Sequence, residues 1–375
     1  MAQKELVFDT TLEINMNNLI SNLNYFKSLI QPQTKIMVMV KAFSYGLGTY
    51  EIASLLEKNN VDYLAVANTY EGIELRKEGI QIPIMVMKPE LDSFDLVLEN
   101  QLTPTIFSLY ALNKLVKTLE NSSSVSNEHP FLISIKIDTG MHRLGFDKKD
   151  IAELIDLVKK YPFIKIESIF SHLAASDEIE HDEFTLQQIE NLNSCSGIFE
   201  QEFDYHIDKH ILNSNGIIRF NHAQMDMVRL GIGVYGIVND PVTQQHLLPV
   251  STLKSKIAQL KQINKGDTIG YNRNGIASQN LTIATIPVGY ADGLSRRLGN
   301  GNWSMLVNGK EAPIIGNVCM DMVMIDVTDI ECKENDEAFI FGDKNPISEM
   351  AEKIGTIPYE ILTSYSPRVR RIFKY

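Results

Sequence analysis

The stretch "KIMVMVKAFSYGLG", residues 35–48, decides the fold. Its apolar first half predicts a strand over 35–41, buried on both faces as in a parallel sheet. The strand ends on Lys41, and the chain then passes through Tyr45 and two glycines. The carboxyl end of a barrel strand is where such barrels keep their active sites, so Lys41 is a candidate for Schiff-base chemistry. An exposed lysine at a strand end is the other interpretation.

Seven further apolar runs follow, and helical patterns separate them. In "LISNLNYFKSLI" (19–30) and "IAELIDLVKKY" (151–161), apolar residues recur every three or four positions, which predicts amphipathic helices. Eight strands alternating with helices predict a (β/α)8 barrel. Besides 35–41, the strands are expected at 63–68, 82–88, 103–108, 131–138, 166–172, 210–214 and 226–230.

From about residue 246 the pattern changes to short strands separated by Gly and Asn turns, as in "WSMLVNGKEAPIIG". This pattern is typical of a mainly β domain. We therefore expect an α/β fold with a (β/α)8 barrel over 12–245, followed by a β domain over 246–375 with which residues 1–11 associate.

Composition excludes several classes of protein. Lys and Arg total 35 against 47 Asp and Glu, a net charge of −12, which argues against nucleic acid as a partner. The sequence has no apolar run of about 20 residues and no signal peptide, so we expect no membrane association and a cytoplasmic location. The three cysteines are not spaced like metal ligands, and no metal is expected.

The stretch "VKAFSYGLG" (40–48) resembles the "VKANAYGHG" signature of alanine racemases. Matches to the same family continue in order through nearly the whole chain, and eight ordered matches are far more specific than any single one. The others are "KIDTGMHRLGF" (136–146), "SHLAASD" (171–177), "LNSNG" (212–216), "VRLGIGVYG" (228–236), "GDTIGYNRNG" (266–275), "PVGYADGLSRRL" (287–298) and "GNVCMDMVMIDVT" (316–328).

The resemblance implies a pyridoxal-phosphate enzyme that interconverts L- and D-alanine and supplies D-alanine for peptidoglycan. Family members are homodimers in which the partner subunit completes each active site. The lysine motif is similar to that of racemase modules fused behind a cell-wall ligase, although this chain carries no ligase domain.

By resemblance, Lys41 would hold pyridoxal phosphate and act as a base on one face of Cα. Tyr271 of the partner subunit would be the second base, and because a phenol is a poor base at neutral pH, nearby cations must stabilise its phenolate. His172 would lie beside the cofactor ring. Arg229 would face the ring nitrogen and, being always charged, would leave that nitrogen unprotonated.

The resemblance also assigns contacts to the cofactor and the substrate. The cofactor contacts are Tyr45, Asn213, Ser214 and the backbone N–H groups of Gly231 and Ile232. Arg143 would contact the substrate carboxylate, Met320 would offer it a backbone N–H, and Tyr290 would line the passage to the site. Lys136 matches a lysine that is often carbamylated in this family, and a carbamate there would pair with Arg143.

Two stretches depart from the family pattern. Leu47 replaces a histidine, and Phe43 and Ser44 also differ, so this flank is expected to pack differently. An alignment of "YEILTSYSPRVRRIF" without gaps places Pro367 where the family has a tyrosine that binds phosphate; Tyr365, two residues earlier, is the alternative.

Three other functions stay open at this point. A racemase of broader specificity is the nearest. A decarboxylase of basic amino acids on a related fold lacks support, because its "CGP-x-C-D" signature is absent. A pyridoxal-phosphate carrier without enzymatic activity would be a single barrel, which 246–375 and Tyr271 argue against.

Overall fold

The computed structural model describes residues 8–123 and 125–375. The chain divides into two compact units. One contains Ile20–Ser44 and Thr49–Leu248; the other contains the described residues up to Leu19, Tyr45–Gly48 and Pro249–Tyr375. We call them the barrel unit and the β unit. Residues 1–11 are expected from the sequence to associate with the β domain. Of these, residues 1–7 lie outside the described residues.

The barrel unit is built on eight parallel strands in the order β8-β7-β6-β5-β4-β3-β2-β9. Beyond the paired strands, the Arg229 N–H donates to the Leu212 carbonyl at 2.9 Å and the Asp226 N–H to the Lys209 carbonyl at 3.1 Å, which links the first and last strands of this order. The predicted barrel is confirmed. Its strands are β2 (Lys35–Met39), β3 (Tyr63–Val66), β4 (Ile84–Val86), β5 (Thr103–Ile106), β6 (Phe131–Lys136), β7 (Ile164–Phe170), β8 (Asp208–His210) and β9 (Met227–Leu230).

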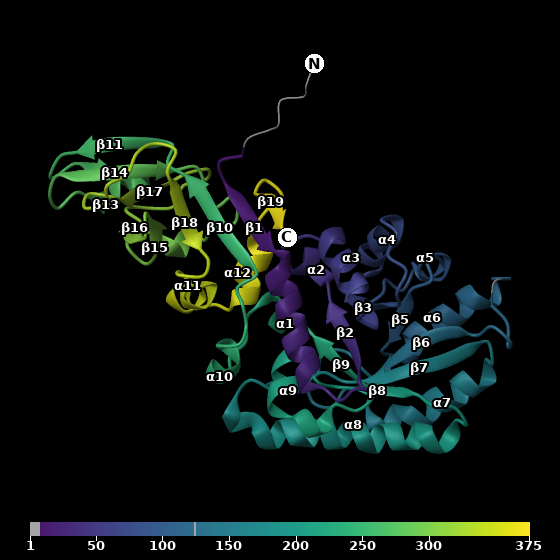
Figure 1. Cartoon of the computed structure of the whole chain (residues 1–375). Coiled ribbons are helices and arrows are strands. Elements are labelled where there is room, and N and C mark those ends of the chain that lie inside the picture. The colour runs from purple at the N-terminus through teal and green to yellow at the C-terminus, as the bar shows by residue number, and fades with distance from the viewer. Residues whose placement is uncertain (1–7, 124) are drawn as a thin grey trace. The chain divides into compact units, whose positions relative to one another are not determined.

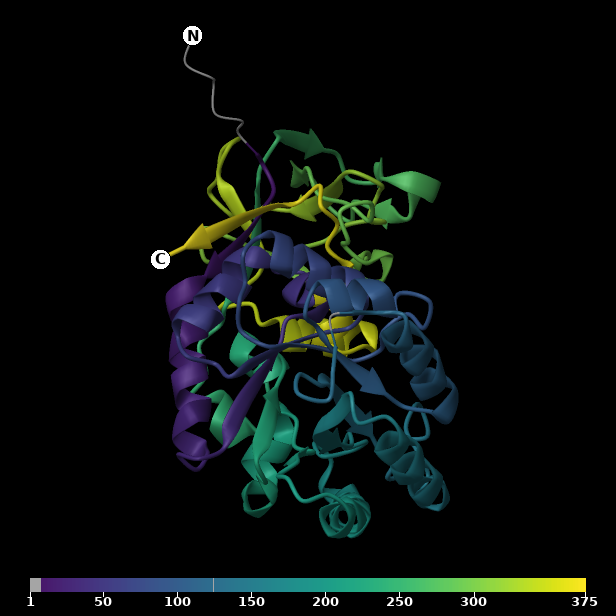
Figure 2. The same ribbon diagram turned by 90° about the vertical axis from the view of Figure 1, so that its right-hand side faces the viewer.

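Helices surround these strands in Figures 1 and 2. The amphipathic patterns bury their apolar faces as expected: Leu23 and Phe26 of α1 and Leu154 and Val158 of α7 are buried. The helices are α1 (Met16–Leu29), α3 (Tyr50–Lys58), α4 (Thr69–Lys77), α5 (Phe94–Glu99), α6 (Leu109–Glu120), α7 (Ile151–Lys160), α8 (Asp182–Glu202), α9 (Ser214–Arg219) and α10 (Pro241–Gln244).

The β unit contains a six-stranded sheet in the order β16-β15-β18-β10-β1-β19. Strand β1 (Thr11–Asn15) comes from the start of the chain, pairs antiparallel with β10 (Ser251–Lys256) and runs parallel to β19 (Arg370–Lys374). The neighbouring labels in Figure 1 follow this order. Residues 12–15, which the sequence analysis placed in the barrel, therefore lie in this sheet, because their hydrogen-bonding partners come from the C-terminal part.

The remaining strands of the β unit form a three-stranded sheet, a short hairpin and the edge of the large sheet. Two helices complete the unit, and its mainly β character agrees with the prediction. The elements are β11 (Gln259–Ile263), β12 (Thr268–Ile269), β13 (Gly275–Ile276), β14 (Leu281–Ile286), β15 (Ser304–Val307), β16 (Lys310–Pro313), β17 (Val323–Asp326), β18 (Glu337–Phe341), α11 (Ile347–Ile354) and α12 (Pro358–Ser364). Among the described residues, no helix is both long enough and apolar enough to cross a membrane.

Candidate active site

Lys41 lies two residues beyond the end of β2 and begins a left-handed turn, α2 (Lys41–Tyr45). Ala42, Phe43, Ser44 and Tyr45 have φ of 52°, 57°, 48° and 56°, and none of them is glycine. A left-handed helical conformation costs about 1–2 kcal/mol per residue that carries a Cβ, so contacts elsewhere must hold it.

Two contacts in the barrel unit hold the residues around Lys41. The Ala42 N–H donates to Glu71 at 2.8 Å, and the other Glu71 oxygen accepts from the Ala67 N–H at 2.7 Å. On the strand side, the buried Tyr235 hydroxyl donates to the Met39 carbonyl at 2.9 Å. Lys41 therefore leaves the barrel in a fixed direction.

Arg229 lies on β9 and is almost completely buried. Its Nη1 lies 2.6 Å from Nδ1 of His210, and its Nη2 donates to the Ser171 and Ile211 carbonyls at 2.6 and 2.9 Å. His172 Nδ1 lies 3.4 Å from the same Nη2. The guanidinium is thus fixed by acceptors from the carboxyl ends of β7 and β8. Its Nε–H makes no hydrogen bond to the described residues.

The Phe170 ring lies close to the cationic side chains of Arg229 and Lys136. Its ring stacks on His210 with centroids 4.9 Å apart, and the Arg229 guanidinium lies 5.2 Å from the ring centre. Lys136 Nζ lies 5.8 Å from the same ring. Cations near an aromatic face are attracted by its quadrupole, so this ring offsets part of the cost of burying the positive charges.

Positive charge dominates the barrel site and changes its titration. The pKa of Lys41 is lowered mainly by burial and, to a smaller extent, by the positive charge of Arg143, whereas Glu71 raises it. The pKa of Lys136 is lowered to about 8, mainly by burial and next by the positive charges of Arg143 and Arg229. Burial and Arg229 lower the pKa of both His172 and His210, which keeps the two rings neutral at neutral pH. A site of this charge suits an anionic ligand.

The loop after β6 carries Arg143, whose side chain is exposed. The Asp138 carboxylate shapes this loop by accepting the Gly140 and His142 N–H groups at 2.9 and 3.1 Å. Lys136, the last residue of β6, has no hydrogen-bond or ion-pair partner for Nζ in the described part of the chain. The "KIDTGMHR" segment thus brings two cations toward each other.

Ser214 begins α9, and its hydroxyl oxygen accepts the N–H groups of Gly231 and Gly233 at 2.9 and 3.2 Å. Both bonds use the oxygen as acceptor, so the hydroxyl hydrogen remains for a ligand. Asn213 caps α9 and accepts the Gly216 N–H at 2.8 Å. The structure therefore gives Asn213 a role in supporting α9. The Gly231 N–H, expected to face a ligand, donates to Ser214.

The remaining predicted residues lie in the β unit. Tyr271 is 70% exposed, and Tyr290 and Met320 are also exposed. The Tyr290 N–H donates to the Cys319 carbonyl at 3.0 Å, and the Ala291 N–H to the Met320 carbonyl at 3.0 Å. Arg368 pairs with Asp292 at 3.3 Å and with Asp321 at 2.8 Å. The segments bearing Tyr290 and Met320 are therefore bound to each other.

Tyr45 and Tyr365 are buried in the β unit. The Tyr45 and Tyr359 rings lie 5.7 Å apart, and Tyr365 lies 5.7 Å from Phe341. The Tyr365 hydroxyl is buried without a hydrogen-bond partner among the described residues. A buried hydroxyl without a hydrogen bond costs free energy, which the packing of the Tyr365 ring must offset. Arg371 supports the neighbouring turn by donating to the Gly46 carbonyl from Nε and Nη2 at 3.0 and 2.9 Å.

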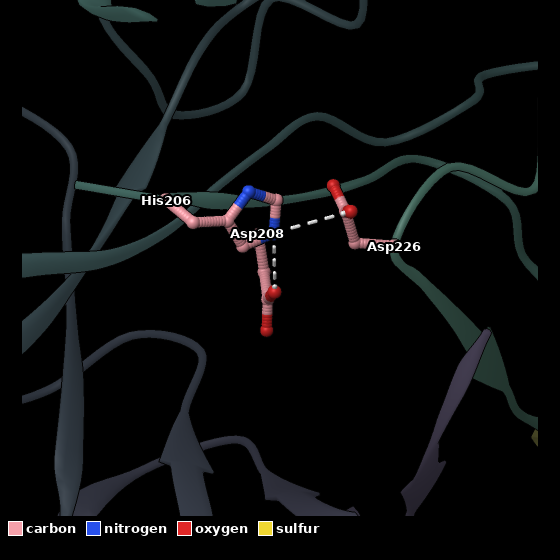
Figure 3. Close-up of side chains that lie close together, drawn as sticks. All are labelled: His206, Asp208 and Asp226. Carbon is pink, nitrogen blue, oxygen red and sulfur yellow. Dashed lines mark ion pairs between the residues drawn. The ribbon is translucent and has the colours of Figure 1, made fainter. Parts of the chain in front are cut away.

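A second cluster of titratable groups lies at the opposite ends of the barrel strands. His206 Nε2 lies 3.2 Å from a carboxylate oxygen of both Asp208 and Asp226 (Figure 3). Asp208 already pairs with Lys35 Nζ at 2.5 Å, and Asp226 accepts the Lys209 N–H at 2.8 Å. These bonds join the starts of β2, β8 and β9, which is a structural role.

Sequence reasoning missed His210, Phe170, Glu71 and Asn317. His210 ends the short polar strand β8 (Asp208–His210), and no pattern in the sequence marks it as a contact of Arg229. Asn317 lies within a matched motif, "GNVCMDM", but its contacts are made with residues far away in the sequence.

Comparisons with known proteins agree with this geometry. Residues 14–239 match the family "Alanine racemase, N-terminal domain" and residues 250–373 match "Alanine racemase, C-terminal domain". The chain is 39% identical to alanine racemase 2 of Caldanaerobacter subterraneus subsp. tengcongensis, over 98% of this chain and 95% of that protein. It is 36% identical to the alanine racemase of Clostridium novyi, over 96% and 94%.

Solved structures give the same result. The alanine racemase of Clostridium difficile 630 superposes with a TM-score of 0.91 at 36% identity, covering 99% of this chain and 97% of that one. The alanine racemase of Bacillus anthracis with bound L-Ala-P gives 0.91 at 30% identity, covering 99% and 96%. This chain therefore belongs to the alanine racemase family.

Proposed function

We propose that this chain interconverts L- and D-alanine with pyridoxal phosphate as cofactor, using one base on each face of Cα. The observation that carries the proposal is the cluster of Lys41, Arg229, Lys136 and Arg143 at the carboxyl ends of the barrel strands. Relatives named alanine racemase support the substrate, and the D-alanine product would serve peptidoglycan synthesis.

The described residues fit the proposed cofactor. The barrel site is cationic, and pyridoxal phosphate is an anion. In the barrel unit, the Ser214 hydroxyl hydrogen is a suitable phosphate donor. The Arg229 Nε–H is left for an acceptor such as the ring nitrogen. When bound, the cofactor supplies an electron-accepting ring that stabilises negative charge at the substrate Cα.

Lys41 would bind the cofactor and then move the proton on one face of Cα. Its lowered pKa raises the fraction of neutral amine, the form that attacks a carbonyl and accepts a proton. The left-handed turn fixes the direction in which the side chain leaves β2. A base held in one position serves one face only.

Arg229 would hold the cofactor ring without transferring a proton to it. Its Nη groups are bonded to carbonyls and to neutral His210, and burial lowers its pKa to about 9, so it stays charged at neutral pH. A ring nitrogen that stays unprotonated withdraws fewer electrons. This weaker electron withdrawal favours return of the proton to Cα over side reactions such as transamination.

Tyr271 of the partner subunit would be the base on the opposite face, in a homodimer. In its own chain the side chain is exposed, and the described residues offer its phenol no hydrogen-bond partner. Exposure of Tyr271, Tyr290, Met320 and Met322 in one unit agrees with a face that a second subunit covers. Arg143 and the Met320 N–H would bind the substrate carboxylate.

Lys136 would act through a carbamate. An unmodified, charged lysine facing Arg143 is repulsive, whereas a carbamate would be anionic and would hold Arg143 in place. The low pKa of Lys136 supports this proposal, because carbamate formation needs the neutral amine.

The direct test uses the purified chain loaded with pyridoxal phosphate. We expect racemisation of L- and D-alanine in both directions, and borohydride reduction followed by peptide mapping should find the pyridoxyl group on Lys41. Comparable turnover of larger amino acids would instead favour a broader racemase. A label on another lysine would overturn the Lys41 assignment.

A further inference from the structure

Asn317 lies between β16 and β17 and is only 8% exposed. Its Nδ2 donates to the Tyr271 carbonyl at 3.0 Å. Its Oδ1 accepts from Asn274 Nδ2 at 3.3 Å and from Asn300 Nδ2 at 3.1 Å. The amide group therefore makes three hydrogen bonds, and its orientation follows from them, because only the NH₂ end can donate to a carbonyl.

The backbone around Tyr271 needs such a contact. Gly270, Asn272 and Arg273 have φ of 75°, 58° and 57°, so Tyr271 stands between residues in left-handed conformations. The flanking strands β12 and β13 are two residues each, too short to fix the loop alone. Within the loop, the Asn274 N–H donates to the Tyr271 carbonyl over 3.5 Å, which is a long and weak hydrogen bond.

The phenol of Tyr271 has no hydrogen bond to the described residues, so the position of this side chain depends on its backbone. Of the hydrogen bonds among the described residues, the bond from Asn317 is the one that reaches Tyr271 from outside residues 268–276. Nearby, the backbone of Gly316 packs against Gly275, where a Cβ would come within 3.1 Å of it. The 316–317 segment thus supports this loop.

The same segment continues to Cys319 and Met320, whose carbonyls accept the Tyr290 and Ala291 N–H groups at 3.0 Å. One short stretch, residues 317–320, therefore holds the backbone of Tyr271 at one end and that of Tyr290 at the other. A shift of Asn317 would move residues at both ends.

We propose that Asn317 is a positioning residue for the Tyr271 base: it acts through the Tyr271 backbone and does not contact the substrate. The inference rests on the proposed function, in which Tyr271 of the partner subunit is the base on one face of Cα. A displacement of about 1 Å is enough to reduce a rate on the order of 100-fold when a catalytic group must reach a reacting atom.

The test replaces the amide NH₂ group of Asn317 with an oxygen atom. Asn317→Asp keeps the shape and the acceptor for Asn274 and Asn300, but it loses the donor to Tyr271 and places a carboxylate oxygen against a carbonyl. Asn308→Asp is the matched control, because Asn308 is another asparagine of the β unit whose Nδ2 donates to a backbone carbonyl, that of Glu331 at 2.9 Å. Tyr271→Phe is measured in parallel.

The readout is exchange of the α-hydrogen in D2O, started separately from each enantiomer of alanine with the dimeric holoenzyme. For Asn317→Asp we expect kcat for exchange of the enantiomer that Tyr271 deprotonates to fall roughly 10- to 100-fold with KM nearly unchanged. Exchange of the other enantiomer, which depends on Lys41, should fall less than about threefold. Asn308→Asp should match the unsubstituted chain.

Equal losses for both enantiomers, or none, in Asn317→Asp would overturn the inference while leaving the proposed function intact if Tyr271→Phe shows the asymmetry. If Tyr271→Phe shows no asymmetry, the base assignment fails and the positioning role falls with it. Should Asn317→Asp not give a folded dimer, Asn317→Ser, whose shorter hydroxyl also loses the bond to Tyr271, is measured in the same way and the same outcomes decide.

Discussion

Arg229 Nη1 and His210 Nδ1 lie 2.6 Å apart inside the barrel. Because a guanidinium only donates, His210 Nδ1 must accept, and the ring is neutral with its hydrogen on Nε2. That nitrogen lies 3.3 Å from the Ser168 hydroxyl. The two ring nitrogens of His210 thus connect Arg229 to Ser168 inside the barrel. The charged Arg229 guanidinium can be buried here because His210 is neutral and accepts its hydrogen bond.

Replacing His210 with leucine should destabilise the fold by about 2–4 kcal/mol, because the buried Arg229 guanidinium would lose an acceptor. His210→Asn, whose amide oxygen can take the place of Nδ1, should cost clearly less. Urea unfolding of both variants checks the difference. Equal losses would mean that stacking on Phe170, not the hydrogen bond, accounts for the role of His210.

Stability should fall as the pH drops below about 6.5. The pKa of His172 and of His210 is lowered in the folded chain, so below the ordinary value of 6.5 the unfolded chain binds more protons than the folded one. Each histidine should then remove up to about 1.4 kcal/mol per pH unit. His210→Asn should show a shallower dependence between pH 6 and 4 in urea unfolding. An unchanged slope would show that His210 titrates normally.

Lys136 should form a carbamate under ordinary bicarbonate. With a pKa of about 8, roughly a quarter of its amine is neutral at pH 7.5, against about one part in a thousand for an ordinary lysine. Carbon-13 NMR with labelled bicarbonate should show a carbamate signal that disappears in Lys136→Met. The exposed Lys148 provides the control, since Lys148→Met should keep the signal. A signal that persists in Lys136→Met would assign the modification elsewhere.

Gly46→Ala should be far more damaging than Gly79→Ala. Both glycines have left-handed φ, +85° and +97°, but a Cβ at Gly46 would overlap the Leu362 carbonyl oxygen, whereas Gly79 faces open space. We expect about 1–2 kcal/mol at Gly79 from backbone strain alone, and at least about 3 kcal/mol at Gly46 with reduced cofactor retention. Thermal unfolding and cofactor absorbance measure both effects. Similar losses would show that φ, not the overlap, decides.

Mixing inactive Lys41→Ala with inactive Tyr271→Phe should restore activity if the partner subunit supplies Tyr271. After random exchange, half of the dimers are hybrids and half of their sites are whole, so roughly a quarter of the unsubstituted activity should return. Mass spectrometry of the mixed dimers verifies the exchange. No recovery after verified exchange would mean that each chain builds its own site.

The barrel could be predicted from the sequence because parallel strands buried on both faces appear as continuous apolar runs, and each of the eight runs overlaps a strand of the barrel. Several predicted strands extend beyond the observed ends, as at 35–41, where β2 stops at Met39. Val40, just past the strand, is still apolar, but the chain turns there and carries Lys41. Apolar composition therefore locates a strand better than its end.

The left-handed turn at Lys41 could not be predicted, since Ala42 to Tyr45 contain no glycine. Contacts with Glu71 and Tyr235, remote in sequence, hold the residues around it. The same reason explains why His210 and Asn317 were missed: their roles are defined by neighbours that only the folded chain provides. The resemblance named the residues that would meet a ligand, whereas those that hold them in place emerged from the hydrogen bonds.

The position of β1 between β10 and β19 has a consequence for synthesis in the cell. A chain emerging from the ribosome makes Thr11–Asn15 before both partners of this strand, Ser251–Lys256 and Arg370–Lys374. The β unit therefore cannot complete its sheet until Arg370–Lys374 has been made, whereas every strand of the barrel has been made by Leu230. Throughout that interval the first strand is an unpaired edge. A fragment beginning near residue 249 would lack the strand that joins β19 to the rest of the sheet, and supplying residues 8–19 as a separate peptide should restore it.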